Sequence, residues 1–429
     1  MRKLLFMLIA SSVMFLVACG GEKSSDSSGS SDSKGSSDDK TIEFWHIEPG
    51  DRGELLKEVA AQFEEENPGV TVKLTRIPND SYKEKLSVAM SGGEVPDVFQ
   101  SWGGGWLKNF ADDGNVLDMT GDVEEGHFNE LALANSTYDD KVYGLPIGLT
   151  IDVVFYNKEI FEEYGLEAPE TFDEWMEINK VLNENNVIPI ALANQTKWPG
   201  AYYFMNFAAR LGGPELFNNA FGRNGQGFDD PAYVEAGAYI QKLVEADAFN
   251  PGFNGLPEDE GQARQLLYSG QAAMMDMTIS ILNNIREEAP EFEEKLDFFV
   301  FPSVPGGEGV QTQVGGSASP VFSVYEDSKN PDLATEFIKL LTSTEVAHDY
   351  VERTGSLSAV AGIEPKDPLV KRFYDITENA THIQMPYDQT LVPELGELHK
   401  DTTQALFGMD MTPEEAAKQM EEKAKELLD

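Results

Sequence analysis

The sequence has one cysteine and few basic residues. Its 429 residues include 32 Lys and Arg against 75 Asp and Glu, which gives a formal net charge of −43. A single cysteine excludes a disulfide framework and any zinc site built from several thiolates. So negative a chain repels nucleic-acid phosphates and anionic lipid, which argues against both as partners. We interpret the acidic excess as a solvated surface suited to a salty or alkaline medium rather than as a binding face.

The common catalytic and metal-binding signatures are also missing. No GxSxG, HExxH, P-loop or GxGxxG motif occurs, and no two of the five histidines stand at metal-ligand spacing. We therefore expect a protein that is not an enzyme, with no cofactor and no metal. Because 75 acidic residues make chance carboxylate pairs plentiful, a secreted glycoside hydrolase stays open as the enzyme-class alternative.

The N-terminal segment is typical of an exported lipoprotein. Residues 1–18 contain a short positive start and an apolar run from Leu4 to Val17, which is too short to cross a membrane comfortably. The LVAC ending resembles a bacterial lipobox, so Cys19 is predicted to carry the lipid, including palmitate, after cleavage. Residues 19–40 are rich in Gly, Ser and Asp and predict a flexible tether. The expected location is the extracytoplasmic face of the cell membrane, reached through a lipid anchor.

From residue 41 onward, strand and helix patterns alternate, as in an α/β fold with mostly parallel sheets flanked by helices. Thr171 begins a capping-box pattern with Glu174, and Thr412 caps the last helix, which runs to about Leu428. The other predicted helices are 54–66, 82–90, 231–247, 259–268 and one that begins at Pro331. The predicted strands are 41–47, 70–76, 95–102, 188–193, 272–277 and 296–304.

Four motifs occur in a fixed order along this folded part. They are Trp45-His46, the GEVPDV segment at 93–98, the YGLPIGLTIDVVFYNK segment at 143–158, and Thr354-Gly355-Ser356 with a terminal TPEEAA helix. This ordered set, after a lipobox, resembles the family 1 extracellular solute-binding proteins. These are sugar-binding subunits of ATP-driven (ABC) importers related to maltose-binding protein.

The resemblance implies a two-lobed, type II-like periplasmic-binding-protein fold joined by a hinge of several crossings. Residues 41–148 plus 320–352 would form lobe 1, and residues 150–316 plus 355–429 would form lobe 2. The crossings would fall near Gly148 to Asp152, Gly315 to Val321, and Val351 to Ser356. The implied partners are a sugar or oligosaccharide and the membrane permease subunits of the importer, and the implied oligomeric state is a monomer.

A neutral sugar presents apolar faces and a ring of hydroxyls, so its site should combine aromatic side chains with carboxylates and amides. We look for these at strand ends and in loops, and exclude Trp175 because its helical spacing with Ile178 and Leu182 indicates core. The candidate ligand-binding residues are Trp45, His46, Glu48, Gln100, Trp102, Asp152, Trp198, Asp276, Met277 and Gly315. The resemblance adds Tyr387 and Asp388, because residues 384–389 match in position a family segment that reaches back to the cleft.

Several alternatives stay open at this stage. Trp45 could pack between the lobes instead of contacting ligand, and Asp152 could brace the hinge without contacting ligand. Trp106 could pack against neighbouring helical residues. A cationic ligand such as a polyamine is the rival to a sugar, because aromatic and acidic side chains also suit ammonium groups. The identity, length and linkage of the sugar are not encoded in any pattern that we recognise.

Overall fold

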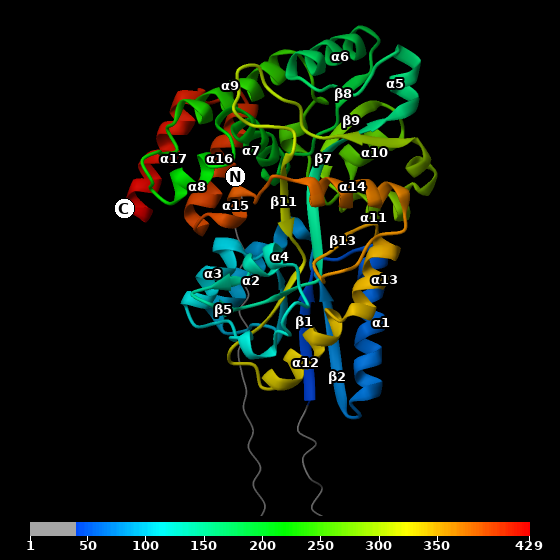
Figure 1. Cartoon of the computed structure of the whole chain (residues 1–429), viewed down its shortest axis with the longest axis vertical. Helices are drawn as coiled ribbons and strands as arrows, with labels where there is room; N and C mark the ends of the chain where they lie inside the picture. The colour runs from blue at the N-terminus through cyan, green and yellow to red at the C-terminus, as the bar shows by residue number, and fades with distance from the viewer. Residues whose placement is uncertain (1–39) are drawn as a thin grey trace, which may run out of the picture. The chain divides into compact units, whose positions relative to one another are not determined.

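The computed structural model describes residues 40–429 (Figure 1). The predicted signal peptide, the lipidation at Cys19 and the tether up to Asp39 lie outside the described residues. Residues 40–429 form one unit, and their strands form two main sheets and one short ribbon. The ribbon pairs β4 (Thr137–Tyr138) with β5 (Lys141–Val142).

The first sheet has five strands in the order β2-β1-β3-β12-β6. Strands β1, β2 and β3 are parallel neighbours, and β12 runs antiparallel to both β3 and β6. The strands are β1 (Lys40–His46), β2 (Val70–Arg76), β3 (Val98–Ser101), β6 (Leu145–Pro146) and β12 (Val321–Val324). The helices of this lobe are α1 (Gly50–Glu66), α2 (Asn79–Gly92), α3 (Gly104–Asp112), α4 (Glu130–Ala134), α12 (Pro331–Leu341) and α13 (Thr344–Thr354), with a 3₁₀ turn at Thr120–Asp122.

The second sheet has seven strands, and β7 (Gly148–Asn157) is its longest. Its path is β14-β11-β7-β9-β8, with β10 and β13 also paired to β7. The remaining strands are β8 (Ile188–Ile190), β9 (Ala272–Thr278), β10 (Leu296–Phe299), β11 (Gln313–Ala318), β13 (Leu357–Ser358) and β14 (His382–Gln384). We expected a mostly parallel sheet. This sheet is instead mixed, because β7 is antiparallel to β9, β10, β11 and β13. The chain enters this lobe along β7, so β7 runs against the strands that later return beside it.

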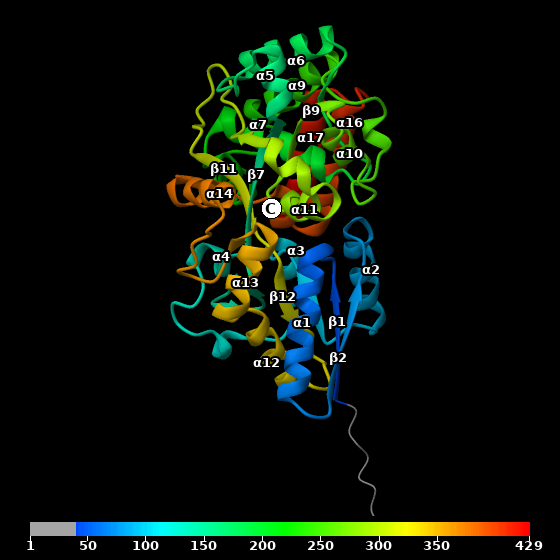
Figure 2. The same ribbon diagram turned by 90° about the vertical axis from the view of Figure 1, so that its right-hand side faces the viewer.

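Helices cover the second sheet on both sides, as Figure 2 shows in the turned view. They are α5 (Lys158–Tyr164), α6 (Phe172–Glu184), α7 (Trp198–Gly212), α8 (Leu216–Phe221), α9 (Pro231–Glu245), α10 (Gln262–Tyr268), α11 (Ile281–Glu288), α14 (Pro368–Asn379), α15 (Tyr387–Thr390), α16 (Pro393–Phe407) and α17 (Pro413–Leu428), with 3₁₀ turns at Phe253–Gly255 and Pro290–Lys295. Trp175 is fully buried among them, at 0% exposure, which confirms its exclusion from the candidate site.

The local patterns explain where these elements begin. The predicted capping box at Thr171 forms, since its hydroxyl accepts from the amide of Glu174. Thr412 caps the last helix as predicted, and its hydroxyl, which accepts from the amide of Glu415, also belongs to a full capping box. Strand β2 has the predicted bounds, whereas β3 and β10 are shorter than the apolar runs that suggested them. The reason is that apolar residues at the ends of those runs are buried in loops, which periodicity alone does not distinguish from strands.

The backbone passes between the two sheets three times. It leaves β6 and enters β7 across Ile147, returns from β11 to β12 across Ser319 and Pro320, and leaves α13 for β13 across Gly355 and Ser356. These three connections bring the carboxyl ends of β1, β2 and β3 to face the second lobe. In α/β folds such an edge is where ligands bind.

Candidate ligand-binding site

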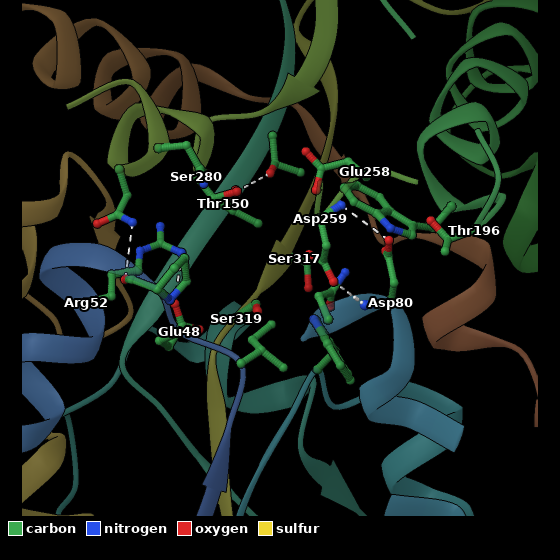
Figure 3. Close-up of a pocket in the computed structure, with 18 of the residues that line it drawn as sticks. Glu48, Arg52, Asp80, Thr150, Thr196, Glu258, Asp259, Ser280, Ser317 and Ser319 are labelled. Carbon is green, nitrogen blue, oxygen red and sulfur yellow. Dashed lines mark hydrogen bonds and ion pairs between the residues drawn. The ribbon is translucent and has the colours of Figure 1, made fainter. Parts of the chain in front are cut away.

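A cavity of about 440 Å³ lies where residues of the two lobes meet (Figure 3). That volume is within the range of small-molecule sites. Its walls include Glu48, Arg52, Arg76, Asp80, Lys83 and Trp102 from the first lobe and Thr150, Trp198, Tyr202, Glu258, Asp259, Arg264, Asn283, Ser317, Asp388 and Lys400 from the second. The first group follows the carboxyl ends of β1, β2 and β3 or lies on the helices that these strands lead into.

One wall is organised around Glu48, which is only 4% exposed. The Gln100 amide donates to Glu48 Oε1 at 2.6 Å, and the Arg52 guanidinium lies 3.4 Å from Glu48 Oε2. Arg52 also donates to the hydroxyl of Ser356 at 2.5 Å. The carboxylate is thus fixed in direction and paired with a cation, so that this wall offers both acceptors and donors to a hydroxyl group.

The opposite wall is formed mainly by Asp80 and Asp259, which lie close together in Figure 3. The Asp80 amide donates to Asp259 Oδ2 at 2.7 Å, and the Asp259 amide donates to Asp80 Oδ2 at 3.2 Å. Burial raises the pKa of Asp259, although the Asp80 amide opposes that rise. Beside them Arg264 pairs with Glu258 and with Glu288, at 2.5 and 2.8 Å. Burial also raises the pKa of Glu258, against the effect of Arg264.

Lys83 and Asp388 form an ion pair of 3.1 Å between the lobes. Burial opposes ionisation of Asp388, but Lys83 and Lys400 outweigh it and hold the pKa of this carboxyl below its usual range. The ammonium of Lys83 also lies 5.0 Å from the centroid of the Trp102 ring. One indole of the cavity wall is therefore in contact with a cation that is itself paired.

Six buried polar atoms of cavity-lining residues have no hydrogen-bond partner within residues 40–429. They are Arg52 Nε, Asp80 Oδ1, Thr150 Oγ1, Thr196 Oγ1, Trp198 Nε1 and Asn283 Oδ1. Buried polar groups in folded proteins are almost always hydrogen-bonded, so a concentration of unpartnered ones around a cavity indicates a polar binding site.

Four of the twelve candidate residues line this cavity: Glu48, Trp102, Trp198 and Asp388. Trp198 is the first residue of α7 rather than part of a loop, and Trp102 lies between β3 and α3, edge-to-face with Trp106. The structure thus brings one tryptophan from each lobe to the same cavity.

Three other candidates lie behind the wall of the first lobe. Gln100 does not line the cavity but holds Glu48, and its own oxygen accepts from the Ile47 amide at 3.1 Å. His46 is buried beside the Phe44 ring, where burial lowers its pKa to about 4 and keeps it neutral. Trp45 packs against the cluster around Tyr82, with the Lys85 ammonium 5.7 Å from its ring centroid. Trp45 and His46 are successive residues of β1, so their side chains leave opposite faces of the sheet and pack in the lobe rather than in the cavity.

Five candidates of the second lobe are interior residues. Asp152 and Asp276 are almost fully buried on neighbouring strands, and a Cβ at Gly315 would lie 1.8 Å from Asp152 Oδ1, so that glycine serves close packing. Met277 belongs to an apolar cluster, and the Tyr387 ring stacks on Phe217 at 4.2 Å. None of these five lines the cavity, because strand ends and loops here continue into packed interior rather than into the cleft.

The residues that the sequence reasoning missed are mostly on helices. Arg52, Lys83, Tyr202 and Lys400 lie on α1, α2, α7 and α16, and Arg76 ends β2. We had searched strand ends and loops and set helical positions aside. A usable signal was present for Arg52 and Lys83, because they lie in the first two turns of helices that directly follow parallel strands.

Comparison with known proteins assigns the chain to a family. The model of the bacterial extracellular solute-binding proteins matches residues 48–348. The chain belongs to the bacterial extracellular solute-binding proteins. This confirms the resemblance noted from the motifs, the two-lobed α/β fold, and the expectation of a binding protein rather than an enzyme.

Individual members of this solute-binding family are similar over most of their length. The multiple sugar-binding protein of Streptococcus mutans is 25% identical, with 85% of each chain covered, and the galactooligosaccharide-binding protein of Bacillus subtilis is 26% identical, with 94% of this chain and 90% of that one covered. A structure solved in work on xylan utilization by Caldanaerobius polysaccharolyticus is 31% identical, with a TM-score of 0.83 and coverage of 89% and 99%. A chitin oligosaccharide binding protein, 24% identical over 90% of this chain and 98% of its own, has a TM-score of 0.82 and shows the shared fold.

Two further features of residues 40–429 concern metal binding and membrane insertion. No group of three or more His, Cys, Asp and Glu side chains in this part of the chain could hold a metal ion. None of its helices is both long enough and apolar enough to cross a membrane.

Proposed function

We propose that this solute-binding protein captures a neutral sugar or oligosaccharide in the cavity between its lobes and delivers it to the membrane permease of an ABC importer. The observation that carries the proposal is the pair of tryptophans, Trp102 and Trp198, that line one cavity from opposite lobes. Indole rings that stack on a sugar remove its apolar faces from water. This burial is the main apolar contribution to the binding free energy in such a site. Relatives whose names specify multiple sugars, galactooligosaccharides or diacetylchitobiose support the ligand class.

The charged residues of the cavity support a neutral rather than an ionic ligand. Glu48 is paired with Arg52, Asp388 with Lys83, and Glu258 and Glu288 with Arg264. A paired carboxylate and cation present an acceptor and a donor side by side, and a hydroxyl group can use both. Because these charges already compensate each other, an ionic ligand would find little net charge to neutralise there.

A cationic ligand such as a polyamine is the second candidate, and three carboxylates favour it. Within residues 40–429, Asp80, Asp259 and Glu287 line the cavity without forming an ion pair to any Lys or Arg. A polyamine would bind with an affinity that falls steeply as salt is added, whereas the affinity for a neutral sugar should barely respond.

We further propose that the two lobes, with the boundaries given above, close around the ligand by bending at the three connections between the sheets. The closed form would dock the permease, and the protein would act as a monomer held by a lipid on Cys19. Changing Cys19 to Ala should release the protein from the membrane fraction and leave ligand affinity unchanged. Retention of that variant in the membrane fraction would contradict the anchor.

The decisive experiment is thermal-shift screening followed by calorimetric titration. The panel comprises galactose, maltose, raffinose, stachyose, xylotriose, diacetylchitobiose and, for the cationic alternative, spermidine. A ligand that binds only the native state raises the melting temperature, by a shift that grows with its concentration. Titration of the best ligand at low and high salt then separates sugar from cation. Binding of spermidine alone, with strong salt dependence, would overturn the proposal in favour of a cationic ligand.

The Asp388→Ala variant sharpens this experiment. In the wild type, the Asp388 carboxylate can accept hydrogen bonds only from certain arrangements of sugar hydroxyls. Loss of this carboxylate should therefore narrow the differences in affinity among the panel sugars. Equal discrimination by the variant and the wild type would place Asp388 outside ligand recognition.

A further inference from the structure

Helix α2 of the first lobe begins without a cap of its own. Its N-cap residue is Pro78, whose side chain has no hydrogen-bonding atom, and no side-chain cap bond is formed from that position. The first amides of a helix need an acceptor, and the N-terminal end of the helix dipole favours a negative charge. Here the acceptor comes from another part of the chain: Asp259 Oδ2 accepts from the Asp80 amide at 2.7 Å.

Asp259 belongs to the second lobe, 179 residues further along the chain. It precedes α10, whose Ala263 and Leu267 pack in the same apolar cluster as strands β7 and β9. Helix α2 instead packs through Tyr82, Leu86 and Met90 onto the cluster that contains Phe99 of β3. The hydrogen bond therefore joins the two lobes, and it forms only in an arrangement that brings α2 and the Asp259 loop together.

The loop that presents Asp259 is braced from its own lobe. The Gly261 amide donates to the Glu258 carbonyl at 2.9 Å, and Arg264 donates to the same carbonyl at 2.9 Å. Asp80 returns the contact, since its Oδ2 accepts from the Asp259 amide at 3.2 Å. One turn further along α2, Lys83 forms its ion pair with Asp388 of the second lobe. The same face of α2 thus meets the second lobe at two successive points.

We propose that Asp259 is a closure residue: it supplies the N-cap of α2 across the cleft and so stabilises the closed arrangement of the lobes. When the lobes separate, Pro78 leaves α2 uncapped, because the proline side chain cannot replace the lost acceptor. The free energy of this cap is then available only to the closed form. A ligand that binds only the closed form therefore binds more tightly, by the factor through which the cap raises the population of the closed form relative to the open form.

The geometry of another helix supplies a direct test. Asp230 caps α9 from its own chain with φ −55° and ψ 140°, and accepts from the Ala232 amide two residues on. Pro78 has nearly the same backbone, φ −53° and ψ 140°, and the amide two residues on is that of Asp80. A Pro78→Asp variant is therefore expected to cap α2 in both the open and the closed form. It should raise the melting temperature while weakening ligand binding, a combination that loss of structure does not produce.

The test compares four full-length proteins: wild type, Asp259→Ala, Pro78→Asp and the control Glu260→Ala. The control changes the next acid along the loop, which is exposed and accepts from the Gln262 side chain of its own lobe at 3.3 Å. Calorimetric titration uses the panel sugar with the largest thermal shift. Asp259→Ala should weaken binding about 2- to 30-fold, the effect of losing one N-cap. Pro78→Asp should weaken it similarly, and Glu260→Ala should bind like wild type.

A second measurement does not depend on the sugar, and this matters because the affinity readout rests on the proposed function. Spin labels on cysteines introduced at the exposed positions Val88 and Val310, with Cys19 changed to Ser, report the distance between the lobes. Asp259→Ala and Pro78→Asp should move this distance distribution toward larger values. If no panel sugar binds, the proposed function fails and the distance measurement alone decides the closure role. If Asp259→Ala matches Glu260→Ala in both measurements, or if Pro78→Asp changes neither, the proposal is wrong.

Discussion

Two helices of the second lobe begin in opposite ways, although each carries a tryptophan near its start. Helix α6 has a complete capping box between Thr171 and Glu174, and its Trp175 is fully buried. Helix α7 begins after Lys197 in a left-handed conformation, with no side-chain cap, and its Trp198 lines the cavity with an unpartnered indole nitrogen. The first helix start is completed by its own capping residue. At the second, Asn194 Oδ1 accepts from the Gly200 amide at 3.0 Å, and the donor left without a partner is the indole nitrogen of Trp198.

The same contrast extends to other helices of the described chain. Helices α1, α2, α7 and α11 begin in the cavity wall, and none of them has a side-chain cap of its own. Helices α4, α5, α6, α9, α13, α14 and α17 begin elsewhere and are all capped by their own Asn, Asp, Ser or Thr. Helices α8, α12 and α16 also begin without a side-chain cap, although their first residues do not line the cavity. Among the helices that begin at the cavity, α2 takes an acceptor from the opposite lobe, whereas the Gly200 amide of α7 donates to Asn194 Oδ1 of its own lobe at 3.0 Å.

Among the substitutions that test this contrast between the two helix starts, the largest change in stability is expected for the buried Trp175. Changing Trp175 to Ala should lower the free energy of unfolding by about 3–5 kcal/mol, because the removed ring leaves a cavity among packed aromatic side chains. Denaturant unfolding measures the loss, and calorimetric titration of the folded fraction should show unchanged affinity. A variant with wild-type stability would contradict the packing role.

The matched changes at the cavity should show the reverse pattern. Trp198→Ala and Trp102→Ala should each weaken ligand binding by about 2–4 kcal/mol, the range of dominant contact residues, with a smaller effect on stability than Trp175→Ala. Titration with the best panel sugar measures the affinity. If both variants bind like wild type, the ligand occupies some other part of the protein.

The buried carboxylates behind the cavity should make stability depend on pH. Burial raises the pKa of Asp152 from 3.8 to about 6, and burial together with Asp152 raises the pKa of Asp276. A raised folded-state pKa means that stability is present below the ordinary value and is lost as pH rises through the folded value. Asp276→Asn should thus be more stable than wild type at pH 8, because an uncharged amide avoids the cost of ionising a buried carboxyl beside Asp152.

Chemical unfolding of both proteins at pH 4.5 and pH 8 checks this prediction through the difference between them. Taking the difference removes the opposing contribution of the buried His46 and His399, whose pKa values burial lowers to about 4. An Asp276→Asn protein that is less stable than wild type at both pH values would show that the carboxylate has a partner worth more than its burial costs.

The smallest expected effect is at the cap of α6. Thr171→Ala removes the hydroxyl that accepts from the Glu174 amide and should lower stability by about 1 kcal/mol. Because α6 begins away from the cavity, ligand affinity should not change. Thermal unfolding and titration of the same sample test both halves, and a loss of affinity would show that the two helix starts are coupled.

Much of the scaffold was predictable because its signals are local. The alternation in 70–76, the helical spacing around Trp175 and the two capping boxes each depend on residues within a few positions of one another. The candidate site was less predictable. The position of Glu48 after a strand suggested it, and the match to a family segment suggested Asp388, but Asp152 and Asp276 have the same chemistry and lie in the interior.

The sequence by itself determined the family, through its ordered motifs, and those helices and strands whose periodicity or caps lie within neighbouring residues. It could not determine that Asp259 would cap α2 or that Lys83 would meet Asp388, because these partners are 179 and 305 residues apart. Which polar side chains face the cavity depends on how the two sheets are placed by three connections of a few residues. Only the tertiary structure decided that placement, because it arises from packing across the whole chain rather than from any local pattern.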